Sequence, residues 1–358
     1  MEIKNSKIIL FNPRSSDAKH RIPNSILQVG GAIEGVFDYF FIDGNLEKDP
    51  LLGILNLIET ENIQFVGLTV MPGPQLKQAI PFSKTIKEKH PNITIIWGGY
   101  FASNQYKSVL DSDYVDFVIS GPADTAFPLL IQNLINNDTE NLASIPNLIY
   151  KENGAITKTK KEALPDMDNL HEFPYDKLNQ KYPLQNYLAK TFMGKTTFSY
   201  HSSFGCPFTC SFCAVVPIYN AKWKGFKAEK IAKDVLWFKE NYGIDAVEFH
   251  DNNFFTAKKR VVEFAEKIKH ENISWWGEGR IDTINKYSDD DLLLMKEAGL
   301  KMIFLGAETG NDEVLKKMDK GGTQTGQQIK DFAVRMGKIG IIPEYSFVLG
   351  LPNDDSSK

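Results

Sequence analysis

The three cysteines of this chain lie in one short segment, Cys206-Pro-Phe-Thr-Cys210-Ser-Phe-Cys213, and its 358 residues contain no others. The CxxxCxxC spacing allows three thiolates to bind three irons of a [4Fe–4S] cluster. The fourth iron then stays open and can chelate a small molecule. The segment therefore predicts chemistry at an iron–sulfur centre rather than simple electron storage.

Other uses of three cysteines remain as alternatives. A zinc site would take His201 or His250 as its fourth ligand, but structural zinc usually has two paired arms, and this sequence has no second arm. A disulfide fits poorly with an odd number of cysteines and no secretory segment. Three inert thiols are the remaining alternative.

Length and composition limit the class of protein. A chain of 358 residues with 42% hydrophobic and 24% charged residues can build two globular domains. A net charge of −4 gives no basic footprint, which argues against a nucleic-acid partner. The N-terminus has no signal-peptide pattern, and no apolar run approaches the ~20 residues of a membrane span. These features predict a cytoplasmic protein.

The first 136 residues alternate short apolar runs with helical stretches, which predicts an α/β domain with a doubly wound parallel sheet. Ligands of such sheets bind beyond the carboxyl ends of the strands. The expected strands are 7–11, 37–42, 65–70, 93–97 and 117–120.

Small residues end several of these strands, and they allow a bulky ligand to approach the backbone; simple turns are the alternative. They are Thr69, Val70, Gly98, Gly99 and Gly121. The first strand is not followed by GxGxxG, so a dinucleotide is a weak interpretation. Residues 137–195 are expected to form a connector with a small β-hairpin at Asn153-Gly154.

From residue 196 the βα rhythm returns and predicts a partial (β/α) barrel over 196–358, with its site at the carboxyl ends of the strands. The expected strands are 197–203, 246–250, 274–280, 302–307 and 345–349. Residues that could bind or react lie at four of these strand ends. The cysteine segment follows the first strand and Asp251-Asn252 follows the second, whereas Arg280 ends the third and Glu308 follows the fourth. A buried arginine or carboxylate is costly unless it is paired or binds a charged ligand. An Arg280–Glu308 pair that only braces the barrel is the alternative.

The cysteine segment, with Phe212 before its third cysteine, resembles that of the radical S-adenosylmethionine (radical SAM) superfamily. This resemblance implies that Cys206, Cys210 and Cys213 hold the cluster and that its open iron binds S-adenosylmethionine. An external flavodoxin or ferredoxin would provide the electron that releases a 5′-deoxyadenosyl radical. The backbone near Phe212 would lie against the adenine.

The resemblance also suggests roles for the polar strand ends. Asp251 and Asn252 would approach the methionine amine, Arg280 the carboxylate end, and Glu308 the ribose or amino end of S-adenosylmethionine.

A doubly wound domain ahead of the cysteine domain resembles the cobalamin-binding branch of the superfamily. The small strand-end residues would then hold the corrin and its nucleotide tail. The DxHxxG motif of proteins that ligate cobalt through histidine is absent, and Asp17-Ala-Lys-His20 has the wrong spacing. We therefore expect no histidine below the cobalt, with His20 as the alternative ligand.

The predicted function is cobalamin-dependent methylation of an unactivated carbon in a small molecule. Alternatives are radical cyclisation or oxidation without methyl transfer, and a non-catalytic cobalamin and iron–sulfur protein. A methylthiolating RNA-modifying enzyme would carry further cysteines and a basic tail, which are not visible here. The family's barrel has six strands, whereas this sequence stops soon after Gly350-Leu351-Pro352, so we expect the barrel to be incomplete.

Overall fold

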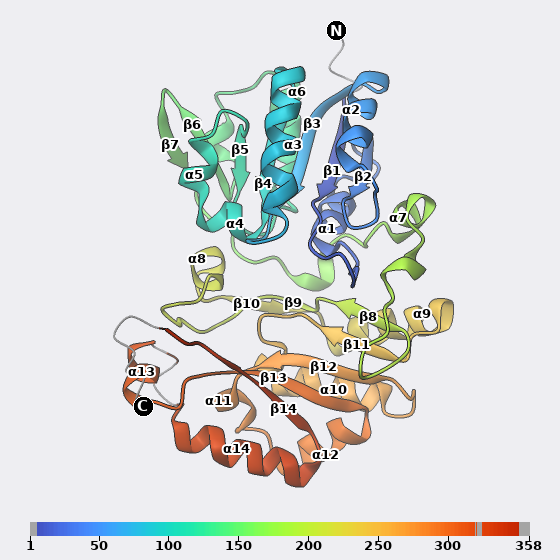
Figure 1. Cartoon of the computed structure of the whole chain (residues 1–358), viewed down its shortest axis with the longest axis vertical. Helices are drawn as coiled ribbons and strands as arrows, with labels where there is room; N and C mark the ends of the chain where they lie inside the picture. The colour runs from blue at the N-terminus through green and yellow to red at the C-terminus, as the bar shows by residue number, and fades with distance from the viewer. Residues whose placement is uncertain (1–5, 319, 321–323, 351–358) are drawn as a thin grey trace. The chain divides into compact units, whose positions relative to one another are not determined.

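The computed structural model describes residues 6–318, 320 and 324–350 (Figure 1). Its chain divides into two compact units. Unit 1 comprises Met1–Ala163 and Asn169–Tyr187, and unit 2 comprises Leu164–Asp168 and Leu188–Lys358. The expected end of the barrel beyond Gly350 lies outside the described residues.

Unit 1 contains a seven-stranded sheet in the order β2-β1-β3-β4-β5-β6-β7. Its strands are β1 (Lys7–Asn12), β2 (Tyr39–Asp43), β3 (Ile63–Thr69), β4 (Thr94–Gly98), β5 (Phe117–Ile119), β6 (Leu148–Glu152) and β7 (Ala155–Lys158). The first five pair in parallel, which confirms the predicted sheet. The expected hairpin is β6–β7, and it extends this sheet because β6 pairs antiparallel with β5.

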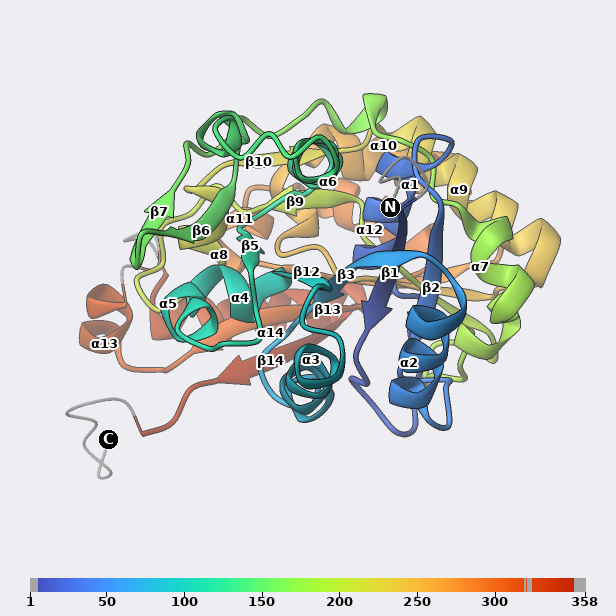
Figure 2. The ribbon, with the colours of Figure 1, turned by 90° about the horizontal axis from the view of Figure 1, so that it is seen from above.

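Helices cover both faces of the first sheet, as a doubly wound fold requires. They are α1 (Asn24–Ile33), α2 (Pro50–Thr60), α3 (Leu76–Lys89), α4 (Gly99–Asn104), α5 (Tyr106–Leu110) and α6 (Ala126–Ile135). Figure 2 shows α1 and α6 on one face and α2 to α5 on the other. Because both faces are covered, the central strands are continuously apolar: Ile8, Ile9 and Leu10 of β1 are all buried.

The segment 169–187 packs on unit 1 and contains helix α7 (Tyr175–Lys181). Two tyrosines attach it to the end of β2. The hydroxyl of Tyr187 donates to Asp43 at 2.7 Å, and the hydroxyl of Tyr182 donates to Glu47 at 2.6 Å. Much of the expected connector is therefore fixed to unit 1 through its side chains.

Unit 2 contains a five-stranded, fully parallel sheet in the order β14-β13-β12-β11-β8. Its strands are β8 (Thr197–Tyr200), β11 (Ala246–Phe249), β12 (Ser274–Gly279), β13 (Leu300–Glu308) and β14 (Ile342–Phe347). A separate two-stranded ribbon pairs β9 (Ser203–Gly205) with β10 (Trp223–Gly225). The parallel βα succession confirms the fold class expected for this half of the chain.

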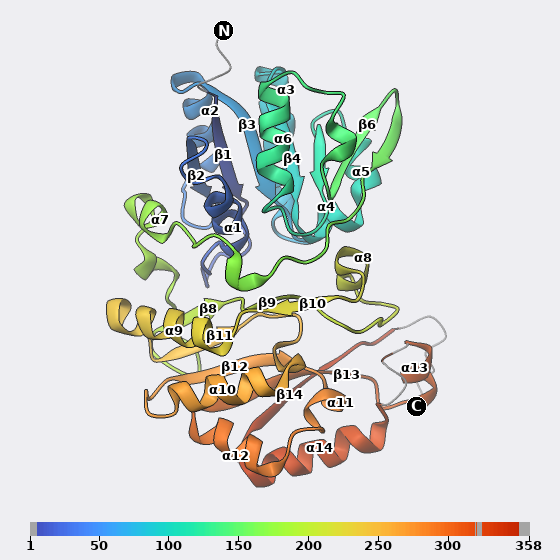
Figure 3. The same ribbon diagram turned by 180° about the vertical axis from the view of Figure 1, so that it is seen from behind.

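One face of the second sheet is covered by a row of helices (Figure 3). The row consists of α9 (Ala228–Tyr242), α10 (Lys258–Ile268), α12 (Asp289–Glu297) and α14 (Gly326–Ile339). Shorter helices are α8 (Val215–Tyr219), α11 (Ile281–Ile284) and α13 (Asp312–Lys317), and the 3-10 turns are η2 (Leu142–Ser144), η3 (Met167–Asn169), η4 (Leu184–Tyr187) and η5 (Phe254–Thr256).

Local capping explains where several of these helices begin. Asp49 accepts a hydrogen bond from the backbone of Leu52 and so caps α2, whose first residue is Pro50. Ser288 caps the N-terminus of α12 and Thr325 caps that of α14, each through a reciprocal capping box.

Candidate functional site

The cysteine segment lies between β9 and α8 of unit 2. Cys210 is buried, and Cys206 and Cys213 are partly buried. The backbone of Cys213 donates to the carbonyl of Cys210, which forms a tight turn, and the backbone of Ser211 donates to the carbonyl of Met318. Phe212 is exposed, so its ring adds nothing to the core. Burial raises the pKa of the Cys206 thiol, an effect that bound iron would reverse.

Arg280 connects the cysteine segment to the end of β12. Its Nη1 lies 3.0 Å from the sulfur of Cys210, and its guanidinium lies 3.8 Å from the ring centroid of Phe208. Its Nε and Nη2 donate to the two carboxylate oxygens of Asp282 at 2.9 and 2.7 Å. Because Nε and Nη2 both bind Asp282, the planar guanidinium is held with Nη1 facing the sulfur of Cys210.

Glu308 pairs with Lys320, a partner that no sequence pattern indicated. Its carboxylate lies 2.5 Å from Nζ of Lys320, which also donates to the carbonyl of Gly306. Arg280 donates to the backbone carbonyl of Lys320 at 2.7 Å. Arg280 and Glu308 thus each form an ion pair with another residue, Asp282 and Lys320 respectively, rather than the mutual brace considered above.

The backbone of Glu308 is strained. Its φ is +65°, in the left-handed region that non-glycine residues rarely adopt, and the pairing of β13 with β14 shifts register between Gly306 and Glu308. Such strain is concentrated at functional sites, where the surrounding structure maintains it. The geometry is compatible with a binding role for Glu308, which stays a prediction.

Asp251 is completely buried at the end of β11. It accepts hydrogen bonds from the backbone and hydroxyl of Ser202 at 3.0 and 2.9 Å, and from the hydroxyl of Ser203. Arg260 of α10 donates to the same Ser202 hydroxyl. Burial raises the pKa of Asp251 despite the nearby charge of Arg260. One oxygen of Asp251 thus organises the strand that leads into the cysteines.

Two polar groups lie beside this network. The second oxygen of Asp251 is buried without a hydrogen bond among the described residues, and the buried amide of Asn253 faces the thiol of Cys206, whose pKa it lowers against the larger effect of burial. Buried polar atoms normally have partners, so this oxygen of Asp251 is a place where a ligand or ordered water would be accommodated. Asn252, which the sequence singled out, is only half-buried. Sequence reasoning missed Asn253, although it lies two residues beyond Asp251.

The donor set can be compared with what a single metal ion would require. Among the described residues, no three His, Cys, Asp or Glu side chains gather closely enough to hold one ion. Zinc would require its ligands around a single point, whereas a cluster attaches each thiolate to a different iron. The arrangement therefore does not support the zinc alternative with His201 or His250.

The strand ends of unit 1 bring most of the small residues together. Thr69 pairs with Gly98 in the register of β3 and β4, and the backbone of Val70 donates to the carbonyl of Gly98. Gly99 has φ +87°, and a side chain there would lie 2.8 Å from the backbone of Val70. A Cβ at Gly98 would make only ordinary contacts of 3.8 Å. Gly121 follows the neighbouring strand with φ +113°.

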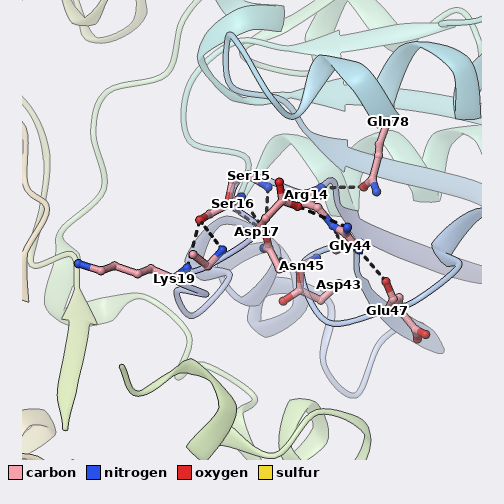
Figure 4. Close-up of polar contacts among 11 residues, drawn as sticks. Arg14, Ser15, Ser16, Asp17, Lys19, Asp43, Gly44, Asn45, Glu47 and Gln78 are labelled. Carbon is pink, nitrogen blue, oxygen red and sulfur yellow. Dashed lines mark hydrogen bonds and ion pairs between the residues drawn. The ribbon is translucent and has the colours of Figure 1, made fainter. Parts of the chain in front are cut away.

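The loop after β1 is braced against the loop after β2 (Figure 4). Arg14 donates to the carbonyls of Gly44 and Glu47 at 2.8 and 3.0 Å, and its backbone donates to Gln78. The backbone of Ser15 donates to the side chain of Asn45 at 2.8 Å. These contacts make the loop a fixed rim at the carboxyl edge of the sheet.

His20 lies in that same loop and remains an open alternative as a cobalt ligand. It is half-buried, and its Nδ1 is buried without a hydrogen-bond partner among the described residues.

A fixed three-cysteine loop at the carboxyl edge of a parallel βα sheet, next to a guanidinium, defines the class of iron–sulfur enzymes that activate a small molecule at the cluster. Two family models match the chain: "Radical SAM superfamily" over residues 200–357 and "B12 binding domain" over residues 22–131. Residues 200–357 thus belong to the radical SAM superfamily, and a B12-binding domain precedes them in the chain. These matches imply a [4Fe–4S] cluster and S-adenosylmethionine in unit 2 and cobalamin in unit 1.

Curated relatives are similar in sequence. An uncharacterized methyltransferase of Pyrococcus horikoshii is 27% identical over 98% of this chain and 76% of its own length. An anaerobic magnesium-protoporphyrin IX monomethyl ester cyclase of a Synechocystis species is 26% identical over 66% of this chain and 46% of its own length. The chain thus spans less than half of the second relative.

Solved structures share the fold. The cobalamin-dependent S-adenosylmethionine radical enzyme OxsB gives a TM-score of 0.79 at 17% identity, over 97% of this chain and 50% of its own. The radical S-adenosylmethionine methyltransferase TsrM of Kitasatospora setae gives a TM-score of 0.77 at 14% identity, over 97% of this chain and 68% of its own.

Among the described residues, none of the helices has the length and apolar character needed to span a membrane.

Proposed function

We propose that this chain is part or all of a radical SAM enzyme that uses cobalamin to methylate an unactivated carbon of a small molecule. The observation that carries the proposal is the Cys206, Cys210 and Cys213 loop held beside Arg280, in a chain whose other unit matches a B12 binding domain. The cluster, when bound, supplies the electron that cleaves S-adenosylmethionine, and cobalamin supplies a carrier for the methyl group.

The residues of unit 2 have separate tasks in this proposal. The three cysteines hold the cluster, and Arg280 stabilises negative charge on the sulfur of Cys210 through a charge-assisted hydrogen bond. Asp251 fixes the strand that enters the cysteine loop through Ser202 and Ser203.

Five positions would contact S-adenosylmethionine. The backbone near Phe212 would lie along the adenine, and Asn252, with the unpartnered oxygen of Asp251, would approach the methionine amine. Glu308 would bind the ribose or amino end. Arg280 already binds Asp282 through Nε and Nη2. Any contact with the carboxylate of S-adenosylmethionine would therefore have to come from Nη1.

In unit 1, Thr69, Val70, Gly98, Gly99 and Gly121 would form the cobalamin site, where the glycines let a bulky ligand approach the backbone. We propose that no histidine lies below the cobalt. The match to the B12 binding domain begins at residue 22, after His20, which supports this view. The proposed division is a cobalamin-binding domain over 1–136, a connector over 137–195 and a radical SAM domain over 196–358.

The enzyme would need an external electron donor of the flavodoxin or ferredoxin type, and a reducing compartment such as the cytoplasm. The support for the compartment is that all three cysteines are free thiols.

Radical cyclisation or oxidation without methyl transfer is the second candidate. The specific observation that favours it is the similarity to a magnesium-protoporphyrin IX monomethyl ester cyclase. Formation of S-adenosylhomocysteine would distinguish the two, because only methyl transfer produces it.

Electron paramagnetic resonance of the anaerobically reconstituted chain tests cofactor use at the site. We expect a reduced [4Fe–4S] signal that changes when S-adenosylmethionine is added, because the open iron binds it. A signal that is unaffected by S-adenosylmethionine would contradict an open iron, and the absence of any cluster would contradict the cysteine assignment.

A further inference from the structure

The sheet of unit 2 has one face covered by helices and one inner face that carries acidic groups. Phe249 of β11 packs on Phe264 of α10 at 5.3 Å between ring centroids, and Trp275 of β12 packs on the same ring at 5.6 Å. Successive side chains of a strand alternate between its faces. Glu248 and His250 at β11, and Trp276 and Glu278 on β12, therefore lie on the opposite, inner face.

These four residues form a cluster that the proposed chemistry has not used; it is called the inner acidic cluster below. Nε2 of His250 lies 3.2 Å from a carboxylate oxygen of Glu248, and its Nδ1 lies 3.9 Å from one of Glu278. The ring of Trp276 lies 5.2 Å from the ring of His250 and 6.2 Å from that of Phe304 on β13. Two carboxylates, an imidazole and two aromatic rings thus meet across three adjacent strands.

Glu278 has no lysine or arginine partner within the described residues. Two cations of unit 2 have carboxylate partners of their own, Arg280 on Asp282 and Lys320 on Glu308, and Arg260 donates to the hydroxyl of Ser202. The side chain of Glu278 is 34% exposed, so a ligand can reach it. Burial and the charge of Asp251 raise its pKa to about 7, which is the response of a carboxyl that lacks a compensating cation.

A second, independent observation also indicates a ligand. The indole N–H of Trp276 is buried and has no acceptor among the described residues, and Trp276 as a whole is only 9% exposed. A buried donor without an acceptor is costly, so its partner is expected to come from outside the chain. Indole faces also attract cations, which complements the carboxylates beside it.

We propose that Glu248, His250, Trp276 and Glu278 form a recognition site for a protonated amine of the substrate, with an acceptor atom of the same molecule taking the indole N–H of Trp276. The inference rests on the proposed function, because it treats the inner face as the place where the substrate meets the radical chemistry. It narrows the substrate class to amine-bearing small molecules with a nearby oxygen or nitrogen acceptor.

Binding to matched ligand pairs tests the proposal without requiring turnover. The probes are small amino alcohols and aromatic ethylamines, each paired with the alcohol of the same skeleton. They are titrated into the reconstituted chain with cobalamin and S-adenosylmethionine present, and followed by ligand-observed NMR. We expect at least one amine to bind about tenfold or more tightly than its paired alcohol, and Glu278→Gln to reduce that preference to about twofold or less.

Three further variants separate the roles of the individual residues and provide a control. Glu278→Asp retains the charge and should keep the preference, Trp276→Phe should weaken the amines that carry an acceptor, and Glu240→Gln on the exposed side of α9 should change nothing. Affinity for S-adenosylmethionine is measured in each. A lack of any amine preference, or a preference that survives Glu278→Gln, would overturn the proposal.

The test also separates this inference from the proposed function. Loss of S-adenosylmethionine affinity in Glu278→Gln would assign the carboxylate to the cofactor instead and would equally overturn the amine site. Failure of the proposed function itself would be seen as an absence of S-adenosylmethionine cleavage, which these binding measurements do not require.

Discussion

At the scale of single residues, Arg280 contacts one of the three predicted cluster ligands. It places a positive charge and a hydrogen bond on the sulfur of Cys210 at 3.0 Å. Both features make an added electron on a cluster more favourable, since net charge and hydrogen bonds to sulfur set its potential.

Arg280→Gln should therefore shift the reduction potential of the cluster to a more negative value. An electron paramagnetic resonance redox titration of the reconstituted chain measures it. The half-buried Arg335 of α14, which pairs with Asp289 of α12, provides the matched control Arg335→Gln. An unchanged or more positive potential in Arg280→Gln would show that the contact with Cys210 does not act on the cluster.

Glu278 gives a prediction about stability and pH. Its pKa is raised from 4.5 to about 7, so the folded state binds a proton more tightly than the unfolded state. Stability then falls as pH rises from about 4.5 to about 7 and stays lower above that range. Glu278→Gln removes this cost and, with allowance for solvent screening, should raise the free energy of unfolding by about 1–2 kcal/mol at pH 8.

Chemical denaturation of the cofactor-free chain at pH 8 and at pH 5 checks this. The advantage of the glutamine variant should shrink at pH 5, where the native carboxyl is mostly protonated. An advantage equal at both pH values would mean that the charge of Glu278 is not its source.

The sequence could predict where the candidate site residues lie along the strands better than it could predict the side chains they pair with. The cysteine spacing and the polar strand ends are local patterns, and the chain carries them where they were expected. The Lys320 partner of Glu308 lies in the loop after α13, with no periodicity that indicates it, and only the folded β13 brings the two together. Trp276 and Glu278 needed the packing of Trp275 to show which face of β12 they share.

At the scale of elements, hydrophobic patterning located all ten parallel strands, but not the pairing of the hairpin. β6 adds to the edge of the first sheet beside β5, and a pairing partner depends on which edge the fold leaves open rather than on the strand's own residues. Helix α4 begins at Gly99, directly after β4, because that glycine reaches φ +87° where the chain must turn at once.

Gly99→Ala should destabilise the fold by about 2–4 kcal/mol, since the new Cβ would adopt a strained φ and lie 2.8 Å from the backbone of Val70. The neighbouring Gly98→Ala is the matched control, because its Cβ meets nothing nearer than 3.8 Å. Denaturant unfolding compares the two. Equal stability of both variants would contradict the packing described for this turn.

At the scale of the whole molecule, each unit has its own parallel sheet and its own proposed cofactor site. Cys210→Ala should therefore abolish the cluster and all cleavage of S-adenosylmethionine while cobalamin binding persists. Absorbance spectra of the reconstituted variant with and without added cobalamin measure both. Cleavage that survives in the variant would contradict the assignment of Cys210, and a simultaneous loss of cobalamin binding would show that the two sites depend on each other.

The central claim is that one chain uses both cofactors for methyl transfer. Mass spectrometry of the products after anaerobic reconstitution with cobalamin, reductant and S-adenosylmethionine tests it most directly. We predict 5′-deoxyadenosine together with S-adenosylhomocysteine, the latter only when cobalamin is present. 5′-Deoxyadenosine without S-adenosylhomocysteine would contradict methyl transfer and favour cyclisation or oxidation, and the absence of both products would contradict catalysis by this chain.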